Sequence, residues 1–179
     1  EEADLDECLV KNIQDNLDVL PSDMNLAGAE IEFQEVEDKE TLLKRYLDKV
    51  RDNYDFILID CPPSLNILTI NALTAADTVL VPIQCEYYAL EGLNQVLKTV
   101  ELVKRKLNPQ LELEGVVFTM YDARTNLSLQ VVESVKNNLN QTIYKTIIPR
   151  NVRLAEAPSH GMPINLYDTR STGAESYRM

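Results

Sequence analysis

The sequence contains little glycine and few aromatic residues, and it has no tryptophan. Its five glycines are scattered, so the 179 residues include no glycine-rich loop of the kind that cradles phosphate groups. No apolar run approaches the ~20 residues that a membrane-spanning helix needs. The three cysteines are odd in number and lack metal-ligand spacing, which favours a reducing, cytoplasmic setting over a disulfide framework.

Basic residues are also scarce: 17 Lys and Arg stand against 29 Asp and Glu, for a formal net charge of -12. Taken whole, this charge argues against binding to nucleic acid. The acidic excess lies in residues 1–114, however, and residues 115–179 carry slightly more basic than acidic residues. The C-terminal third can therefore present a local basic patch. The simpler alternative is an acidic, solvated surface that keeps the protein in solution.

The length and composition favour a single domain. A chain of 179 residues that is 45% hydrophobic can bury one sizeable core, so we predict one domain over residues 1–179. Residue 1 is Glu rather than Met, and we expect the sequence to be a piece of a longer protein.

Short runs rich in Val, Ile and Leu alternate with helical patterns along the chain. The runs predict strands at residues 17–20, 56–60, 78–83, 115–120 and 143–148, and the helical patterns cover residues 41–51, 65–76, 89–107 and 127–139. Strands that alternate with helices in this way predict an α/β fold, with a mostly parallel sheet between helices on both faces. In such three-layer folds, ligands bind at the carboxyl ends of the strands.

Three predicted strands end in polar or proline-containing loops, which are DCPPS, TMYDARTN and IPRNVR. The first follows the apolar run FILID and begins with Asp60. A carboxylate at the end of a buried strand is costly to desolvate, unless a cation or a hydrogen-bond donor meets it. In P-loop nucleotidases this pattern, called Walker B, helps to hold Mg²⁺. The alternative is that Asp60 only caps a helix starting near Leu65.

Longer strings make a family resemblance specific. The segments YDFILIDCPPSLNILTINAL, VLVPIQCEYYALEGL, TMYDARTNLS and IPRNVRLAEAPSHG, in this order, resemble the ParA/Soj-type chromosome and plasmid partition ATPases. These are deviant-Walker-A members of the P-loop class and are related to the cell-division regulator MinD. The resemblance begins around NLDVLPS and covers nearly the whole chain. It implies a P-loop NTPase-like fold that here lacks its first strand, P-loop and helix.

The departures from the family pattern matter as well. No KGGVGKT-type loop occurs, and the aspartate-containing segment that positions the attacking water is missing. We therefore expect a truncated chain that hydrolyses ATP poorly or not at all by itself. Near the C-terminus, YDTRSTGAE differs from the usual YDPRSRGAE. Thr169 replaces a proline and Thr172 an arginine, which removes one candidate phosphate contact.

The resemblance implies roles for residues in the three polar loops. Asp60 corresponds to the Walker B carboxylate that holds Mg²⁺, through water, and Cys61, Pro62, Pro63 and Ser64 correspond to the switch II loop. Two prolines restrict this loop to few conformations, as suits a sensor of the γ-phosphate. Cys61 itself is expected to be a small buried residue rather than a nucleophile, because no basic partner is near it in sequence.

Other positions correspond to residues that the family uses to bind adenine and DNA. The adenine pocket is implied at Thr119, Met120, Pro149, Arg150 and Asn151. Ordinary packing at the end of a strand is the alternative for the first two. Arg124 and Arg153 match arginines that bind DNA without sequence preference, and solvated loop arginines are the alternative there. His160, the sole histidine, is expected to be structural.

The resemblance thus implies a partition ATPase with ATP and Mg²⁺ as cofactors. In the family, ATP clamps a homodimer, the dimer binds DNA non-specifically, and a centromere-binding ParB-type partner stimulates hydrolysis. A cytoplasmic, nucleoid-associated protein with no membrane contact is expected. Two rivals remain open: a MinD-like regulator, which would need a C-terminal amphipathic helix to bind membrane, and a non-enzymatic pseudo-ATPase that competes for partners.

Overall fold

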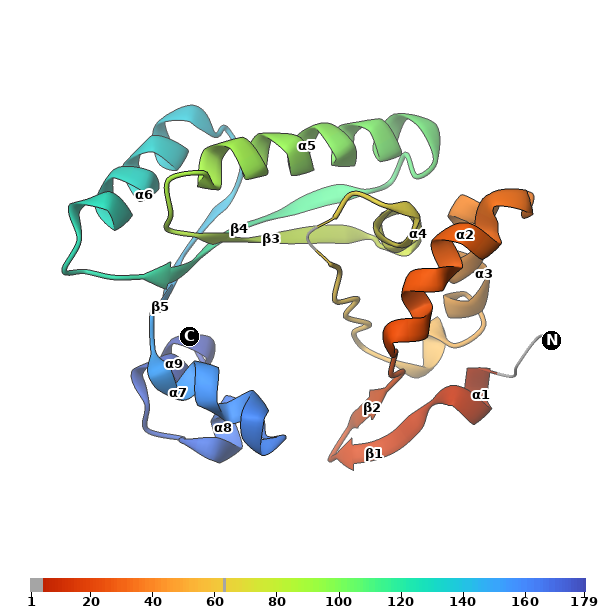
Figure 1. Ribbon diagram of the computed structural model, residues 1–179, viewed down its shortest axis with the longest axis horizontal. Coiled ribbons are helices and arrows are strands. Elements are labelled where there is room, and N and C mark those ends of the chain that lie inside the picture. Colours follow the sequence, from red (N-terminus) through yellow and green to blue (C-terminus); the bar gives the residue numbers. More distant parts are fainter. Residues whose placement is uncertain (1–4, 63) are drawn as a thin grey trace. The chain divides into compact units, whose positions relative to one another are not determined.

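The computed structural model describes residues 5–62 and 64–179, so Pro63 of the predicted switch II loop lies outside the described residues. The chain divides into two compact units, the first ending at Ala76 and the second running from Asp77 to Met179 (Figure 1). Among the described residues, only the second unit contains a sheet of more than two strands.

The first unit begins with helix α1 (Leu5–Cys8) and a β-hairpin. Strands β1 (Val10–Gln14) and β2 (Leu17–Val19) pair in antiparallel fashion, and Asn16 between them takes a left-handed φ of 60°. Asparagine tolerates this conformation better than most residues, because its short polar side chain can bond locally. The short strand predicted at residues 17–20 is confirmed, and it belongs to this separate two-stranded sheet.

Short helices make up most of the remaining first unit. They are η1 (Met24–Gly28), α2 (Ala29–Glu32), η2 (Phe33–Glu35), η3 (Lys39–Thr41), α3 (Leu42–Leu47), η4 (Arg51–Asn53) and α4 (Ile67–Ala75), where η denotes a 3₁₀ helix. Helices α3 and α4 confirm the helices predicted at residues 41–51 and 65–76, and both are shorter than predicted. Asn66 caps α4, because its side-chain oxygen accepts a hydrogen bond from the Thr69 backbone N–H at 3.1 Å.

Asn71 joins α3 to α4 through a buried amide. Its Nδ2 donates to the carbonyl oxygens of Lys39 at 2.8 Å and Ile67 at 3.0 Å. Its Oδ1 accepts from the backbone N–H of Leu43 at 3.0 Å. Because the donors and the acceptor of this amide are all used, its burial is compensated, and it fixes the first turn of α3 against α4.

The strand predicted at residues 56–60 is wrong. Residues 56–62 have no regular secondary structure, and Phe56 and Leu58 are 85% and 92% exposed. A strand exists only where neighbours supply ladder partners for its N–H and C=O groups, and no described strand pairs with this segment. The apolar run indicates a tendency to be buried, but it does not show that a neighbouring strand is present to pair with it.

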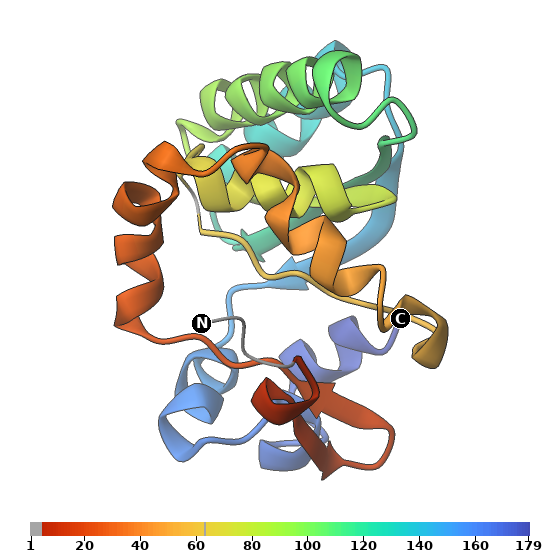
Figure 2. The same ribbon diagram turned by 90° about the vertical axis from the view of Figure 1, so that its right-hand side faces the viewer.

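The second unit contains a three-stranded parallel sheet in the order β3 (Thr78–Gln84), β4 (Glu112–Tyr121) and β5 (Ile143–Pro149). Helices α5 (Ala89–Lys106) and α6 (Asn126–Asn138) connect successive strands. Figures 1 and 2 show both helices along the same face of this sheet. All five elements were predicted from the sequence to within three residues at each end, and the α/β fold with a parallel sheet flanked by helices is confirmed.

The core of the second unit lies between the sheet and these two helices. Apolar side chains from alternate positions of β3 and β4 meet the inner faces of α5 and α6, the central ones being Val81, Ile83, Leu93, Val116, Phe118, Val131, Val132 and Val135. This arrangement explains the different periods along the sequence: strands turn every second residue inward, and helices every third or fourth. The core holds the carboxyl ends of β4 and β5 in fixed register.

Four short helices follow β5 and complete the second unit. They are α7 (Val152–Glu156), η5 (Ala157–His160), α8 (Ile164–Tyr167) and α9 (Thr172–Tyr177), and α9 contacts β5. The imidazole of His160 stacks on the ring of Tyr167 with centroids 4.9 Å apart. The contact packs His160 against α8 at the surface of the second unit.

Candidate functional site

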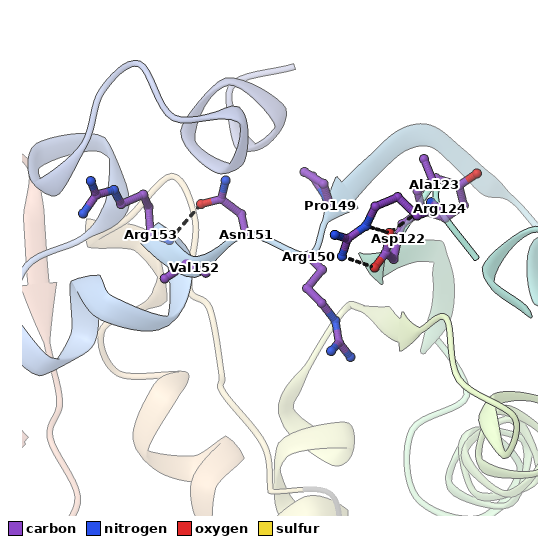
Figure 3. Close-up of a pocket in the computed structure, with 9 residues that line it drawn as sticks. Asp122, Ala123, Arg124, Pro149, Arg150, Asn151, Val152 and Arg153 are labelled. Atoms are coloured by element: carbon purple, nitrogen blue, oxygen red, sulfur yellow. Dashed lines mark hydrogen bonds and ion pairs between the residues drawn. The ribbon is translucent and has the colours of Figure 1, made fainter.

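A pocket of ≈ 460 Å³ lies at the carboxyl ends of β4 and β5. Residues 121–124, which follow β4, line it together with residues 149–153, which follow β5 (Figure 3). Two of the three polar loops singled out in the sequence therefore meet. The strand order explains why: β4 and β5 are parallel neighbours, with Tyr121 opposite Pro149 in the register, so their ends reach the same edge of the sheet.

A backbone hydrogen bond fixes the spacing of the two loops. The N–H of Arg150 donates to the carbonyl oxygen of Tyr121 at 2.8 Å, just beyond the last register pair. Arg124 follows β4 and Arg153 follows β5, and these two strands are neighbours in the sheet. Both residues line the same pocket.

Arg124 is held by the carboxylate of Asp122. Its Nε donates to Asp122 Oδ1 at 2.9 Å and its Nη2 to Asp122 Oδ2 at 2.7 Å, while its backbone N–H donates to Oδ1 at 3.0 Å. The side chain of Arg124 is nevertheless 87% exposed, against 18% for Asp122. The hydrogen bonds from Arg124 hold the pKa of Asp122 well below its usual range, so this carboxylate is ionised at neutral pH.

Arg150 points away from this pair, as Figure 3 shows. Its Nη2 lies 3.0 Å from Oε1 of Glu86, which follows β3, and both side chains are about half exposed. The ion pair links the loops after β3 and β5 across the end of β4. Its local net charge is close to zero, which suits an uncharged ligand group better than a phosphate.

Asn151 and Arg153 organise the short helices after β5. The side-chain oxygen of Asn151 caps α7 by accepting from the Arg153 backbone N–H at 2.9 Å, and its Nδ2 donates to Thr172 Oγ1 at 2.7 Å. The Arg153 guanidinium donates to Glu156 Oε2 at 2.8 Å and lies 3.4 Å from Asp168 Oδ2. Arg153 thus bridges α7 to the segment after α8, and its side chain is 53% exposed.

Thr119 and Met120 lie at the end of β4 but do not line the pocket. The Thr119 hydroxyl donates to the carbonyl oxygen of Ile83 at 3.2 Å within the sheet. Met120 has a left-handed φ of 54°, which is unusual for an unbranched apolar residue. Their nucleotide-binding role stays a prediction.

Asp60 lies in the first unit, in the extended segment without regular secondary structure, and its residue surface is exposed. Within the described part of the chain, no residue is hydrogen-bonded to its carboxylate and no group of three or more potential metal ligands occurs. A Mg²⁺ ion suits such a residue, since it keeps several waters and takes one or two carboxylates beside substrate phosphates. Asp60 could hold the ion through water.

The rest of the predicted switch II loop is described except for Pro63. Cys61 is exposed, so the expectation that it is buried is wrong: the segment around it does not join a sheet. Although the residue is exposed, local desolvation of its sulfur raises the pKa of the thiol, as does the charge of Asp60, and disfavours a thiolate. The carbonyl oxygen of Ser64 accepts from Thr69 Oγ1 at 2.6 Å, which ties the end of the loop to α4.

Comparisons with known proteins decide the family. A family model described as an AAA domain matches residues 1–113. Over 177 residues, the chain is 59% identical to the sporulation initiation inhibitor protein Soj of Bacillus subtilis, covering 99% of this chain and 70% of that protein. It is 49% identical over 178 residues to the chromosome partitioning protein ParA of Caulobacter vibrioides, covering 98% and 67%. The chain belongs to the ParA/Soj family of partition ATPases.

Solved structures agree with this placement. A cobyrinic acid a,c-diamide synthase from Mycobacterium smegmatis, solved with an ATP analogue and magnesium, has a TM-score of 0.84 and 36% identity. The match covers 98% of this chain and 65% of that one, so the chain spans about two thirds of its length. The cell-division ATPase MinD of Pyrococcus furiosus, with a TM-score of 0.74 and 22% identity, shares the fold. The P-loop class of the fold is thereby confirmed.

ParA/Soj motifs in the sequence pointed to the arginines of the pocket but not to their carboxylate partners. Asp122, Glu86 and Asp168 each lie within ion-pair distance of one of these arginines. Asp122 could have been found in YDAR, because an aspartate two residues before an arginine can bond both its backbone and its side chain. Glu86 and Asp168 are distant in sequence from their partners, so only the folded chain reveals those pairs.

The departure at Thr172 also has a structural counterpart in this ParA/Soj chain. Where the usual pattern places an arginine, Thr172 accepts a hydrogen bond from Asn151 and begins α9. The threonine thus connects the start of α9 to the cap of α7. None of the helices in residues 5–62 and 64–179 is long and apolar enough to cross a bilayer.

Proposed function

We propose that the full-length protein is an ATP-dependent partition ATPase that dimerises on ATP, binds DNA non-specifically and is stimulated by a centromere-bound ParB-type partner. The observation that carries the proposal is the pocket, which is lined by both Arg124 and Arg153, in a chain 59% identical to Soj. A nucleoid-associated location follows from the proposed DNA binding. ATP would shift the population toward the dimer, and only the dimer would gather enough arginines to bind DNA well.

The nucleotide-binding part of the proposal assigns Mg²⁺ to Asp60 and the adenine base to residues 119–120 and 149–151. Its support is the availability of the Asp60 carboxylate and the near-neutral Glu86–Arg150 pair beside Pro149 and Asn151. When bound, the ion would neutralise charge on the nucleotide phosphates. The protein's own contribution would be to orient that ion from Asp60 and to relay the nucleotide state through residues 61–64 to α4, to which Ser64 is bonded.

The DNA-binding part rests on exposed guanidinium groups at loop positions. Phosphate contacts from arginines carry no sequence information, so affinity should not depend on base composition and should fall steeply with salt. Arg124 has most of its side chain in solvent. Arg153 is engaged by two carboxylates, which leaves it fewer free N–H groups for a phosphate.

The test of DNA binding is a salt titration of affinity with the full-length protein. Arg124→Ala and Arg153→Ala should each weaken binding to all sequences and flatten the log–log salt slope by roughly 0.9 for each phosphate that the variant no longer neutralises. Arg105→Ala, which removes the same charge from the exposed last turn of α5, is the matched control and should have a smaller effect. ATP-dependent dimerisation, measured on the same variants, should survive. Unchanged affinity and slope in both pocket variants would move the DNA role elsewhere.

Catalysis is tested on the 179 residues themselves. We expect no ATP turnover above a buffer control, because the sequence contains no glycine-rich loop or P-loop lysine to neutralise the phosphates. Supplying an upstream strand–loop–helix from a close relative should restore activity. Robust Mg²⁺-dependent turnover that Asp60→Ala abolishes would contradict this part of the proposal.

A further inference from the structure

We propose that Asp122 is a positioning residue for Arg124, holding its guanidinium in the orientation that a DNA phosphate meets. The inference rests on the proposed function and deepens it. Three hydrogen bonds run from Arg124 to one carboxylate: from its backbone N–H, from Nε and from Nη2, at 3.0, 2.9 and 2.7 Å. Figure 3 shows the two side chains lying against each other at the edge of the pocket.

The turn that carries this pair is itself tied to β4 and α6. The backbone N–H of Asp122 donates to Ser128 Oγ at 3.2 Å, and its carbonyl oxygen accepts from the N–H and the hydroxyl of Thr125, both at 3.1 Å. Thr125 in turn caps α6 through the N–H of Ser128. The carboxylate is therefore anchored on a bonded turn rather than on a free loop.

The geometry leaves part of the guanidinium available. A carboxylate that takes Nε and one N–H of Nη2 occupies one edge of the planar group, and the remaining N–H groups point elsewhere. The side chain of Arg124 is 87% exposed, so these free donors face solvent. Arg153 offers a contrast, since its guanidinium contacts carboxylates from two different segments.

Holding an arginine in place favours phosphate binding because the side chain gives up less entropy when the phosphate arrives. Its opposing effect is repulsion between the Asp122 carboxylate and the phosphate. At an exposed site this repulsion is weakened by water and by a Debye length of about 8 Å at physiological salt. We therefore expect positioning to outweigh repulsion, and removal of the clamp to weaken DNA binding about 3- to 10-fold.

The experiment measures DNA affinity across a range of salt with full-length protein. Asp122→Asn removes the charge, and Asp122→Glu keeps it but shifts the carboxylate by one methylene. Both should weaken binding without flattening the salt slope, because Arg124 is still present. Arg124→Ala should weaken binding and flatten the slope by roughly 0.9 for each phosphate involved. The matched control is Glu114→Gln, which removes an equal charge near the start of β4, where Glu114 accepts from Tyr144 Oη at 3.0 Å.

A double variant separates positioning from any other role. If Asp122 acts through Arg124, then Asp122→Asn should cause no further loss of DNA affinity in a protein that already carries Arg124→Ala. A further 3- to 10-fold loss in that background would overturn the proposal, and so would Asp122→Asn or Asp122→Glu binding as tightly as the parent protein.

A second readout does not involve DNA. The Nε–H proton of Arg124, followed by NMR in the 179-residue chain, should exchange slowly in the parent and in Glu114→Gln but rapidly in Asp122→Asn. Equal exchange in all three would show that the clamp is absent in solution and would overturn the proposal. Unchanged DNA affinity in Arg124→Ala would overturn the DNA assignment on which the proposal rests, and the NMR signal would still report the clamp.

Discussion

Apolar segments of the two compact units differ in how far they are buried. In the second unit, Phe118 lies on the central strand β4 with 0% of its surface exposed. In the first unit, Phe56 lies in an equally apolar run, YDFILID, and is 85% exposed. The difference is pairing: β4 has a strand on each side, and residues 56–60 have none among the described residues. Local hydrophobicity alone does not make a strand.

Two polar contacts connect separate elements of the first unit. The buried Asn71 links η3, α3 and α4, and Asp18 links the hairpin to Tyr54. The second unit relies on a continuous apolar core beneath α5 and α6. A substitution should therefore have a different effect in each unit, depending on which kind of contact it removes.

The largest expected effect separates the two phenylalanines. Phe118→Ala should lower the free energy of unfolding of the second unit by about 3–5 kcal/mol, because it leaves a cavity in a closed core. Phe56→Ala should change stability by less than ~0.5 kcal/mol, since most of its ring is already in water. Urea unfolding followed by hydrogen exchange in each unit measures both. An equal cost at the two positions would mean that residues 56–60 are packed in solution after all.

The next effect concerns the polar contacts of the first unit. Asn71→Ala should cost about 2 kcal/mol, because the carbonyl oxygens and the N–H that the amide now satisfies lose a buried partner. Asn138→Ala is the control: its Nδ2 donates to the Ser134 carbonyl at 2.7 Å on an exposed surface. That change should stay within ~0.5 kcal/mol. Thermal unfolding of both variants would show whether the buried bonds matter as proposed.

Two glycines of the second unit should respond with opposite signs. A Cβ at Gly173 would lie 2.5 Å from Cγ of Leu154, so Gly173→Ala should push α9 away from α7 and cost about 1–2 kcal/mol. A Cβ at Gly92, an exposed position of α5, would meet no atom within 4 Å. Gly92→Ala should stabilise by up to ~1 kcal/mol through helix propensity. The melting temperatures of the two variants measure these effects, and a decrease in both Gly173→Ala and Gly92→Ala would refute the packing argument.

The smallest expected effect is on the pH dependence of stability, to which one carboxylate in each unit contributes. Hydrogen bonds from the Asn12 N–H and Tyr54 lower the pKa of Asp18, and those from Arg124 lower the pKa of Asp122. Each folded pKa lies below the unfolded value of about 3.9. The contribution of each to stability is complete above that value and is lost as the pH falls through the folded pKa.

Stability curves between pH 2 and 6 should therefore fall less steeply in acid for Asp18→Asn and for Asp122→Asn than for the parent. Hydrogen exchange should assign the first change to the first unit and the second change to the second unit. Parallel acid limbs in the parent and both variants would count against the assigned partners.

Much of the second unit could be predicted from the sequence because its signals are local. The apolar run VLVPI and the spacing of apolar residues in α5 are local patterns that predict a strand and a helix. The polar loops after the predicted strands were also visible in the sequence, and two of them meet because β4 and β5 are parallel neighbours that end at the same edge. The family, too, was identified from strings of residues alone.

The distant ion-pair partners Glu86 and Asp168, and the lack of a strand at FILID, could not be predicted in this way. Glu86 is 64 residues from Arg150, and no pattern in the sequence joins them. Asp122 is only two residues before Arg124, but the turn decides that its carboxylate accepts from both the guanidinium and the backbone N–H of Arg124. Such contacts depend on where the backbone places two side chains.

The sequence by itself determined which segments of the second unit are strands and helices, because apolar runs and the helical spacing of apolar residues are local patterns. It also determined the family and the residue types at the pocket. Only the tertiary structure decided that an apolar run stays unpaired, that Asn71 is buried, and that each arginine of the pocket has a carboxylate partner. Hydrogen bonds and ion pairs need two groups within about 3–4 Å, and for groups far apart in the chain that distance is set by the fold.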